Sequence, residues 1–169
     1  MPTALYTLAH LLAPWQSMYS NSKVVSGAVT FVHLSGVLFG GGFAIAADRA
    51  ALRASYAEPE SRQHVLIELA GVHRPVLLGL GALFISGLLQ LTADIETFAV
   101  SPIFWTKMGL VVLLMGNGYR LMRTERALRA RDAIDNRDPL WRQLRGTAVS
   151  SLALWAAIVL AGTILTNSS

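Results

Sequence analysis

Long apolar runs, each bounded by polar or charged residues, dominate this chain of 169 residues. Four runs stand out, and they occupy residues 24–47, 65–93, 102–122 and 146–166. Each is close to the roughly 20 residues that a helix needs to cross about 30 Å of hydrocarbon. Continuous apolar runs differ from the alternating pattern of a barrel strand, so they predict helices. We therefore expect an all-α fold, an integral membrane four-helix bundle that forms one domain over residues 23–169.

The segment before the first run, residues 1–22, is apolar but too short to span a bilayer. Leu5, Leu8, Leu12 and Trp15 recur at helical spacing, and Pro14 is expected to end or kink this helix. The segment lacks the basic region with which a signal peptide begins. We predict a short N-terminal interfacial helix on the outer surface, and favour it over a targeting segment that is removed.

Composition supports the membrane location. Hydrophobic residues make up 53% of the chain and charged residues only 14%, whereas soluble domains carry about 25% charged residues. A chain of this size has too little interior to hide so much apolar surface from water. This balance excludes a soluble enzyme, a disordered tail and a nucleic-acid module. The absence of cysteine excludes disulfides and iron–sulfur clusters.

The basic residues predict the orientation in the membrane. Eleven of the 14 lie in two segments, one after the first run and one after the third. These are Arg49, Arg53, Arg62, Arg120, Arg123, Arg126, Arg129, Arg131, Arg137, Arg142 and Arg145. By the positive-inside rule both segments are cytoplasmic and both termini lie outside. The net charge of +4 therefore reflects topology and contact with the lipid bilayer, and no nucleic-acid partner is expected.

Two ionisable residues lie well inside the runs, where a charge is costly. His33 in the first run either hydrogen-bonds across helices or ligates a metal, as histidine does with haem iron. Lys107 in the third run either extends toward the interface or meets His33 in the outer half of the bundle. Their depths, roughly 13 Å and 8 Å from the outer edge at the rise of a helix, allow that approach.

Two more ionisable residues, His73 and Arg74, lie early in the second run. If this helix begins at Pro75, both are interfacial. If it begins near His64, His73 lies near mid-membrane, not far from His33, and Arg74 can pair with a haem propionate or a quinone oxygen. Glycines dot the first three runs, and either close helix packing or a planar cofactor explains them.

Two segments resemble a known family. The first, FVHLSGVLFGGGFAIAADRAALR, resembles the first helix of the HemJ-type bacterial protoporphyrinogen oxidases and of the related copper-resistance D-like membrane proteins. The second, SPIFWTKMGLVVLLMGNGYRLM, resembles their third helix, with Lys107 at the position of its lysine. The tryptophan that usually follows the histidine is absent here. The matching residues of the first segment are Phe31, His33, Gly36, Gly42 and Arg49.

This resemblance implies a haem b protein of the bacterial cytoplasmic (inner) membrane that transfers electrons or oxidises a porphyrinogen. His33 becomes the metal ligand, and Lys107 the opposite ligand or a substrate partner. His73 is a second candidate for the opposite ligand, and Arg74 a candidate for the propionates. Quinone or a porphyrinogen is the expected partner, and no catalytic residue is assigned. The alternatives are a homo-oligomeric or accessory subunit of a larger membrane complex, a small transporter, and a copper-handling protein.

Overall fold

The computed structural model describes residues 3–130 and 139–168, and every regular element within these ranges is helical. This confirms the all-α prediction. Arg131 and Arg137, two of the arginines used to predict orientation, lie outside the described residues. The elements are α1 (Thr3–Asn21), α2 (Lys23–Gly36), the π-helix η1 (Val37–Gly41), α3 (Gly42–Ala54), α4 (Pro59–Ala93), α5 (Ile95–Val100), α6 (Pro102–Ala130) and α7 (Pro139–Ser168).

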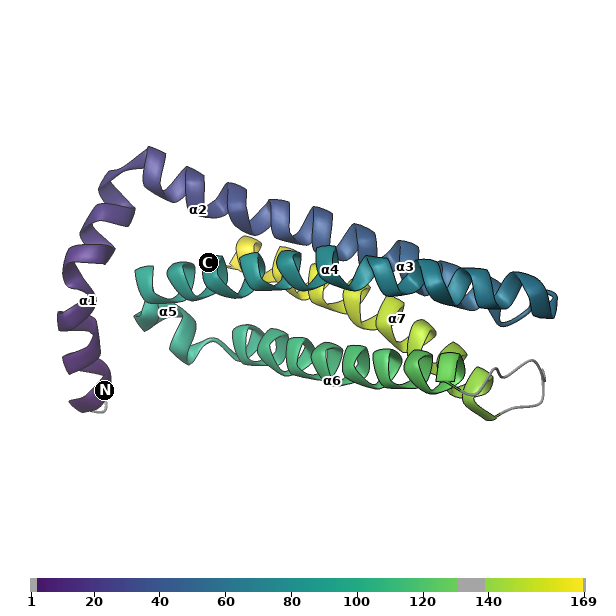
Figure 1. Ribbon diagram of the computed structural model, residues 1–169. Coiled ribbons are helices and arrows are strands. Elements are labelled where there is room, and N and C mark those ends of the chain that lie inside the picture. The colour runs from purple at the N-terminus through teal and green to yellow at the C-terminus, as the bar shows by residue number, and fades with distance from the viewer. Residues whose placement is uncertain (1–2, 131–138, 169) are drawn as a thin grey trace.

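The first expected span lies in one continuous rod made of α2, η1 and α3 (Figure 1). The hydroxyl of Ser22 starts it by accepting a hydrogen bond from the Val25 amide at 3.3 Å, as an N-cap residue does. Gly36 and Gly42, which flank the π-helical turn, both keep right-handed helical backbone angles, so the rod continues through it. The hydropathy pattern does not reveal this turn, because the residues inside it are as apolar as those around it.

The second expected span belongs to α4, which begins at Pro59 and continues through Pro75 to Ala93. Proline suits the first position of a helix, where the backbone amide has no helical partner. The earlier of the two predicted starts is therefore correct, and His73 and Arg74 lie within the helix.

Three segments are long and apolar enough to cross a membrane: Lys23–Ala54, His64–Ala93 and Pro139–Leu165. They indicate a membrane protein. The third expected span, residues 102–122, lies in α6 and does not reach the same apolarity, because Lys107 and Asn117 interrupt it. Length and composition thus support three of the four expected spans.

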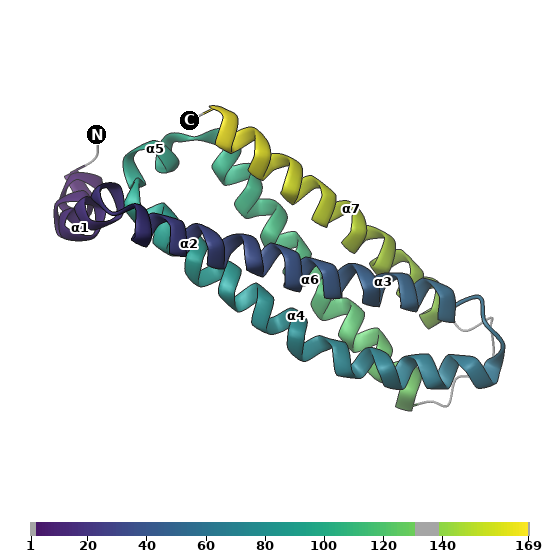
Figure 2. The same cartoon turned by 90° about the horizontal axis from the view of Figure 1, so that it is seen from above.

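The long helices form two pairs. The rod of α2, η1 and α3 packs along α4, and α6 packs along α7. α3 also packs on α7, so the pairs meet where α3 ends and α7 begins, which we call the Arg-rich end. Toward the other end, marked by α5, α2 and α7 diverge in the view of Figure 2.

The N-terminal helix α1 lies across the α5 end of the molecule at a steep angle to the long helices (Figure 1). Trp15 Nε1 donates to the Leu89 carbonyl at 3.1 Å, and Gln16 Nε2 donates to the Thr92 carbonyl at 3.3 Å. Of the two alternatives for Pro14, an end or a kink, the first is wrong, since α1 runs on to Asn21. A separate helix of this kind is what the N-terminal pattern predicts.

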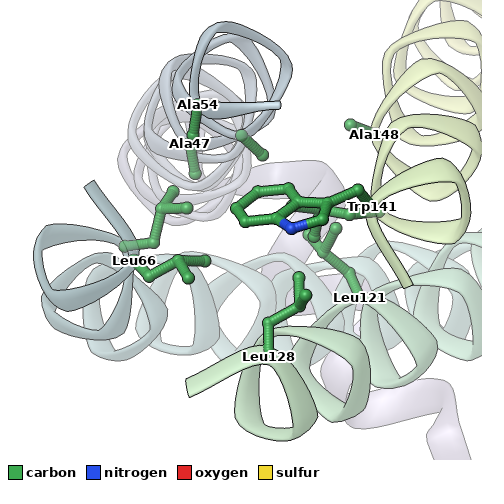
Figure 3. Packing of buried hydrophobic residues seen from close by; sticks show 10 residues of the cluster. Ala47, Ala54, Leu66, Leu121, Leu128, Trp141 and Ala148 are labelled. Atoms are coloured by element: carbon green, nitrogen blue, oxygen red, sulfur yellow. The ribbon is translucent and has the colours of Figure 1, made fainter. Parts of the chain in front are cut away.

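The best-buried core lies at the Arg-rich end, where both helix pairs meet. Trp141 fills its centre between leucines and alanines of α3, α4 and α6 (Figure 3). Trp141 and Leu128 are 1% exposed, and Leu144 is fully buried. A second, smaller cluster of Ala44, Leu114, Trp155 and Ile158 follows toward the α5 end.

Candidate functional site

His33 on α2 is half-buried and points at α4. Its Nδ1 lies 3.0 Å from Oγ of Ser86, which is 1% exposed. The Ser86 hydroxyl donates its only proton to the Ala82 carbonyl at 2.6 Å, one turn earlier in α4. With that proton directed to Ala82, Ser86 Oγ accepts from His33 when the imidazole proton lies on Nδ1. Nε2 is left with a lone pair, which can accept a proton or bind a metal.

Replacing Ser86 by alanine is expected to remove this tautomer preference, because the acceptor for Nδ1–H disappears. In the native chain, ¹⁵N NMR of the histidine rings should show one neutral imidazole protonated at Nδ1. Ser86→Ala should shift that ring toward a mixture of tautomers, while Ser150→Ala, at an exposed position of α7, should leave it unchanged. Protonation of His33 at Nε2 in the native chain contradicts the assignment.

Glycines bring α2 and η1 into close contact with α4 beside His33. A Cβ on Gly79 would lie 2.7 Å from the backbone nitrogen of Gly40 and closer still to its Cα. A Cβ on Gly36 would lie 2.8 Å from Leu83 Cγ. Gly36, Gly40 and Gly79 therefore allow close helix packing. At these positions packing explains the glycines, and a planar cofactor does not. Gly87 is different, since a Cβ there would meet the His33 ring at 3.7 Å.

Lys107 on α6 belongs to the other helix pair. It is half-buried, and a Cβ on Gly162 of α7 would lie 3.6 Å from its Nζ. Its charge is close enough to act on His33. The structure therefore brings the two residues into electrostatic range across the diverging helix pairs.

His73 lies elsewhere. Its Nε2 is 2.7 Å from Oε2 of Glu125 on α6, toward the Arg-rich end. His73 precedes Ser86 by thirteen residues on α4, which is about 20 Å along a helix. The expectation that His73 lies near His33 and can serve as the opposite ligand is wrong. Arg74 is exposed on the surface of α4.

The partner of His73 and a second buried carboxyl were missed from the sequence. Glu125 is fully buried and Asp48 of α3 is 1% exposed. Each stands next to an arginine in the sequence, Asp48 before Arg49 and Glu125 before Arg126. Helical spacing could have indicated the burial of Glu125. It follows Leu121 by four residues and therefore lies on the same apolar face of the helix.

The predicted site residues thus divide into two places. Near the α5 end, an oriented imidazole with a lone pair faces a lysine, an arrangement suited to a metal or an acidic group. Near the Arg-rich end, a histidine meets a buried glutamate. No family model, curated protein or solved structure matches this chain.

Proposed function

We propose that this chain is a four-span membrane protein that binds haem b through His33 and transfers electrons. The observation that carries the proposal is the hydrogen bond from His33 Nδ1 to Ser86. Metal-ligating histidines almost always donate their other ring N–H to a neighbouring acceptor, which fixes the tautomer and the ring orientation. His33 has this arrangement, and haem iron commonly takes such a histidine.

In this proposal α6 is the fourth span, over residues 102–122. It packs along α7, which is apolar enough to span. One of the polar groups that lower its hydropathy is satisfied inside the protein, because Asn117 Nδ2 donates to the Thr147 carbonyl at 2.7 Å. Polar side chains at membrane depth are tolerated when they bond in this way. The Arg-rich end then faces the cytoplasm of a bacterial inner membrane.

The residues around His33 fit a haem in part. The oriented imidazole of His33 and the half-buried Lys107 are the groups that fit, whereas the space at Gly87 is that of a small group, since a Cβ there would meet the His33 ring at 3.7 Å. Haem supplies a one-electron iron couple when bound. Ser86 orients the imidazole, and Lys107 acts from the other pair, as an amine ligand or as an ammonium that holds a propionate. Quinone and a porphyrinogen are the candidate redox partners.

The test is the absorption spectrum of protein purified from haem-supplied cells. We expect a Soret band that shifts on reduction and is lost in His33→Ala. His10→Ala, at an exposed position of α1, is the matched control and should keep the band. Lys107→Arg distinguishes the two proposed roles of the lysine. Arginine keeps the positive charge that would hold a propionate but does not ligate iron. A colourless native protein, or a band unchanged in His33→Ala, overturns the proposal and favours an accessory subunit or transporter.

A further inference from the structure

A layer of polar side chains crosses the interior where the two helix pairs meet. Each of four helices contributes one residue: Asp48 from α3, His73 from α4, Glu125 from α6 and Ser151 from α7. Asp48 and Glu125 are at most 1% exposed and Ser151 is 6% exposed. Asp48 hydrogen-bonds to the Ser151 hydroxyl, and Glu125 Oε2 bonds to His73. The two carboxyls are close enough for their charges to interact.

One oxygen of each carboxyl is left over. Asp48 Oδ2 and Glu125 Oε1 are both buried, and neither has a hydrogen-bond partner among the residues that the structure describes. A buried polar atom without a partner costs free energy, and an ionised carboxylate costs more than a neutral group. Apolar clusters on both sides, around Trp141 and around Trp155, keep this layer away from bulk water.

Among the described residues, the ion pair that the structure shows for these two carboxyls is the one between Glu125 and His73. Within the described parts of these four helices, the remaining charged side chains that are not exposed are Arg62, Lys107, Arg129 and Arg145. Arg62 stacks on Trp141 and Arg145 on Tyr56, each 5.2 Å from the ring centre. Lys107 is eighteen residues from Glu125 on α6, or about 27 Å along the helix. Arg129 lies one helical turn from Glu125 on α6, but the ion pair that the structure shows for Glu125 is with His73, so two ionised carboxyls would share one paired cation.

We propose that Asp48, Glu125, His73 and Ser151 form a proton-binding site, in which one proton is held on the free oxygens of the two carboxyls. This proton supplies the donor that the leftover oxygens lack. It also removes one of two like charges, as in other carboxyl pairs that cannot both ionise. This site does not require haem. The proposal of a proton-binding site is therefore tested independently of the proposal of electron transfer.

His73 connects the site to the outside. Its side chain is 23% exposed, whereas its partner Glu125 is fully buried. A proton taken up on Nδ1 of the neutral ring makes an imidazolium. Release of the Nε2 proton to Glu125 Oε2 then leaves a neutral ring protonated at Nδ1, and rotation of the protonated carboxyl brings the proton to the side of the free oxygens. The carboxyl pair gains one proton and no electron moves, so the site can load and unload through His73.

Infrared spectroscopy of the purified full-length protein in lipid nanodiscs tests the proposal. At neutral pH, exposed carboxyls are ionised, so the carbonyl band of a neutral carboxylic acid reports a buried proton. We expect such a band in the native protein and its loss or shift in Asp48→Asn and in Glu125→Gln. Glu68→Gln, an exposed carboxyl on α4, is the matched control and should leave it unchanged.

Isotope labelling keeps the test valid if the variants fail to fold. In the native chain, ¹³C-labelled aspartate or ¹³C-labelled glutamate should shift the band. His73→Phe should slow proton exchange with D₂O without removing the band. Absence of a neutral-acid band at neutral pH overturns the proposal, as does a band that neither label shifts. A thermal midpoint that depends on Na⁺ at fixed pH also overturns it, because the carboxyls then hold a metal cation.

Discussion

Replacing Gly79 with alanine is expected to destabilise the protein by about 1–3 kcal/mol, the usual cost of overfilling a packed interior. The added Cβ would lie within 2.7 Å of the Gly40 backbone, and backbone cannot move aside as a flexible side chain does. α4 must then separate from η1, which weakens the contact of the whole first helix pair. The measurement is the free energy of unfolding in mixed detergent and SDS micelles.

Gly81 on the same helix provides the matched control. A Cβ at this position meets no atom within 4 Å. Gly81→Ala should therefore be neutral or stabilise α4 by up to about 1 kcal/mol, because alanine is the better helix former. Equal destabilisation by both substitutions would show that the helix pair is not held by backbone contact at Gly40 and Gly79.

Replacing Leu144 with alanine is expected to cost about 2–5 kcal/mol, the range for removing a fully buried leucine. Leu144 is 0% exposed and belongs to the cluster around Trp141, where all four long helical segments contribute side chains. The side chains around Leu144 belong to several helices that are packed against one another. They therefore cannot shift enough to fill the cavity that the substitution leaves. The loss should appear in the same unfolding measurement.

The control is Leu160→Ala, the same substitution two-thirds of the way along α7. Leu160 is 61% exposed on the protein surface, where lipid or detergent refills the vacated space. We expect a change within about 0.5 kcal/mol, as for other surface substitutions. A larger loss at Leu160 than at Leu144 would place the main stabilising contacts at the α5 end, against the packing described above.

The hydropathy pattern predicts most of the architecture. A helix that spans a bilayer needs a long run of apolar residues, and such runs are uncommon in other structures. The segments 24–47 and 146–166 lie inside described helices, and α4 contains 65–93. The interruption at η1 escapes the pattern, since a π-helical turn changes backbone hydrogen bonding without changing composition. Pro14 does not end α1, because proline in a helix removes one hydrogen bond but does not have to end the helix.

The candidate site is predictable only where polarity contrasts with its surroundings. His33 and Lys107 are conspicuous because each lies within a long, mostly apolar run. Asp48 and Glu125 stand among arginines, and their burial follows from which helix face meets the Trp141 cluster. That face depends on how the helix pairs pack together, which the sequence pattern alone does not determine. The pairing of His73 with Glu125 was missed for the same reason.

The divergence of the two helix pairs has a consequence for motion. Packing is densest at the Arg-rich end and thins toward α5, so resistance to local opening should decrease along the molecule in that direction. Amide hydrogen exchange should therefore be slowest near Leu144 and faster in the outer turns of α2 and α7. The Arg-rich end should then be the part of the fold that opens last.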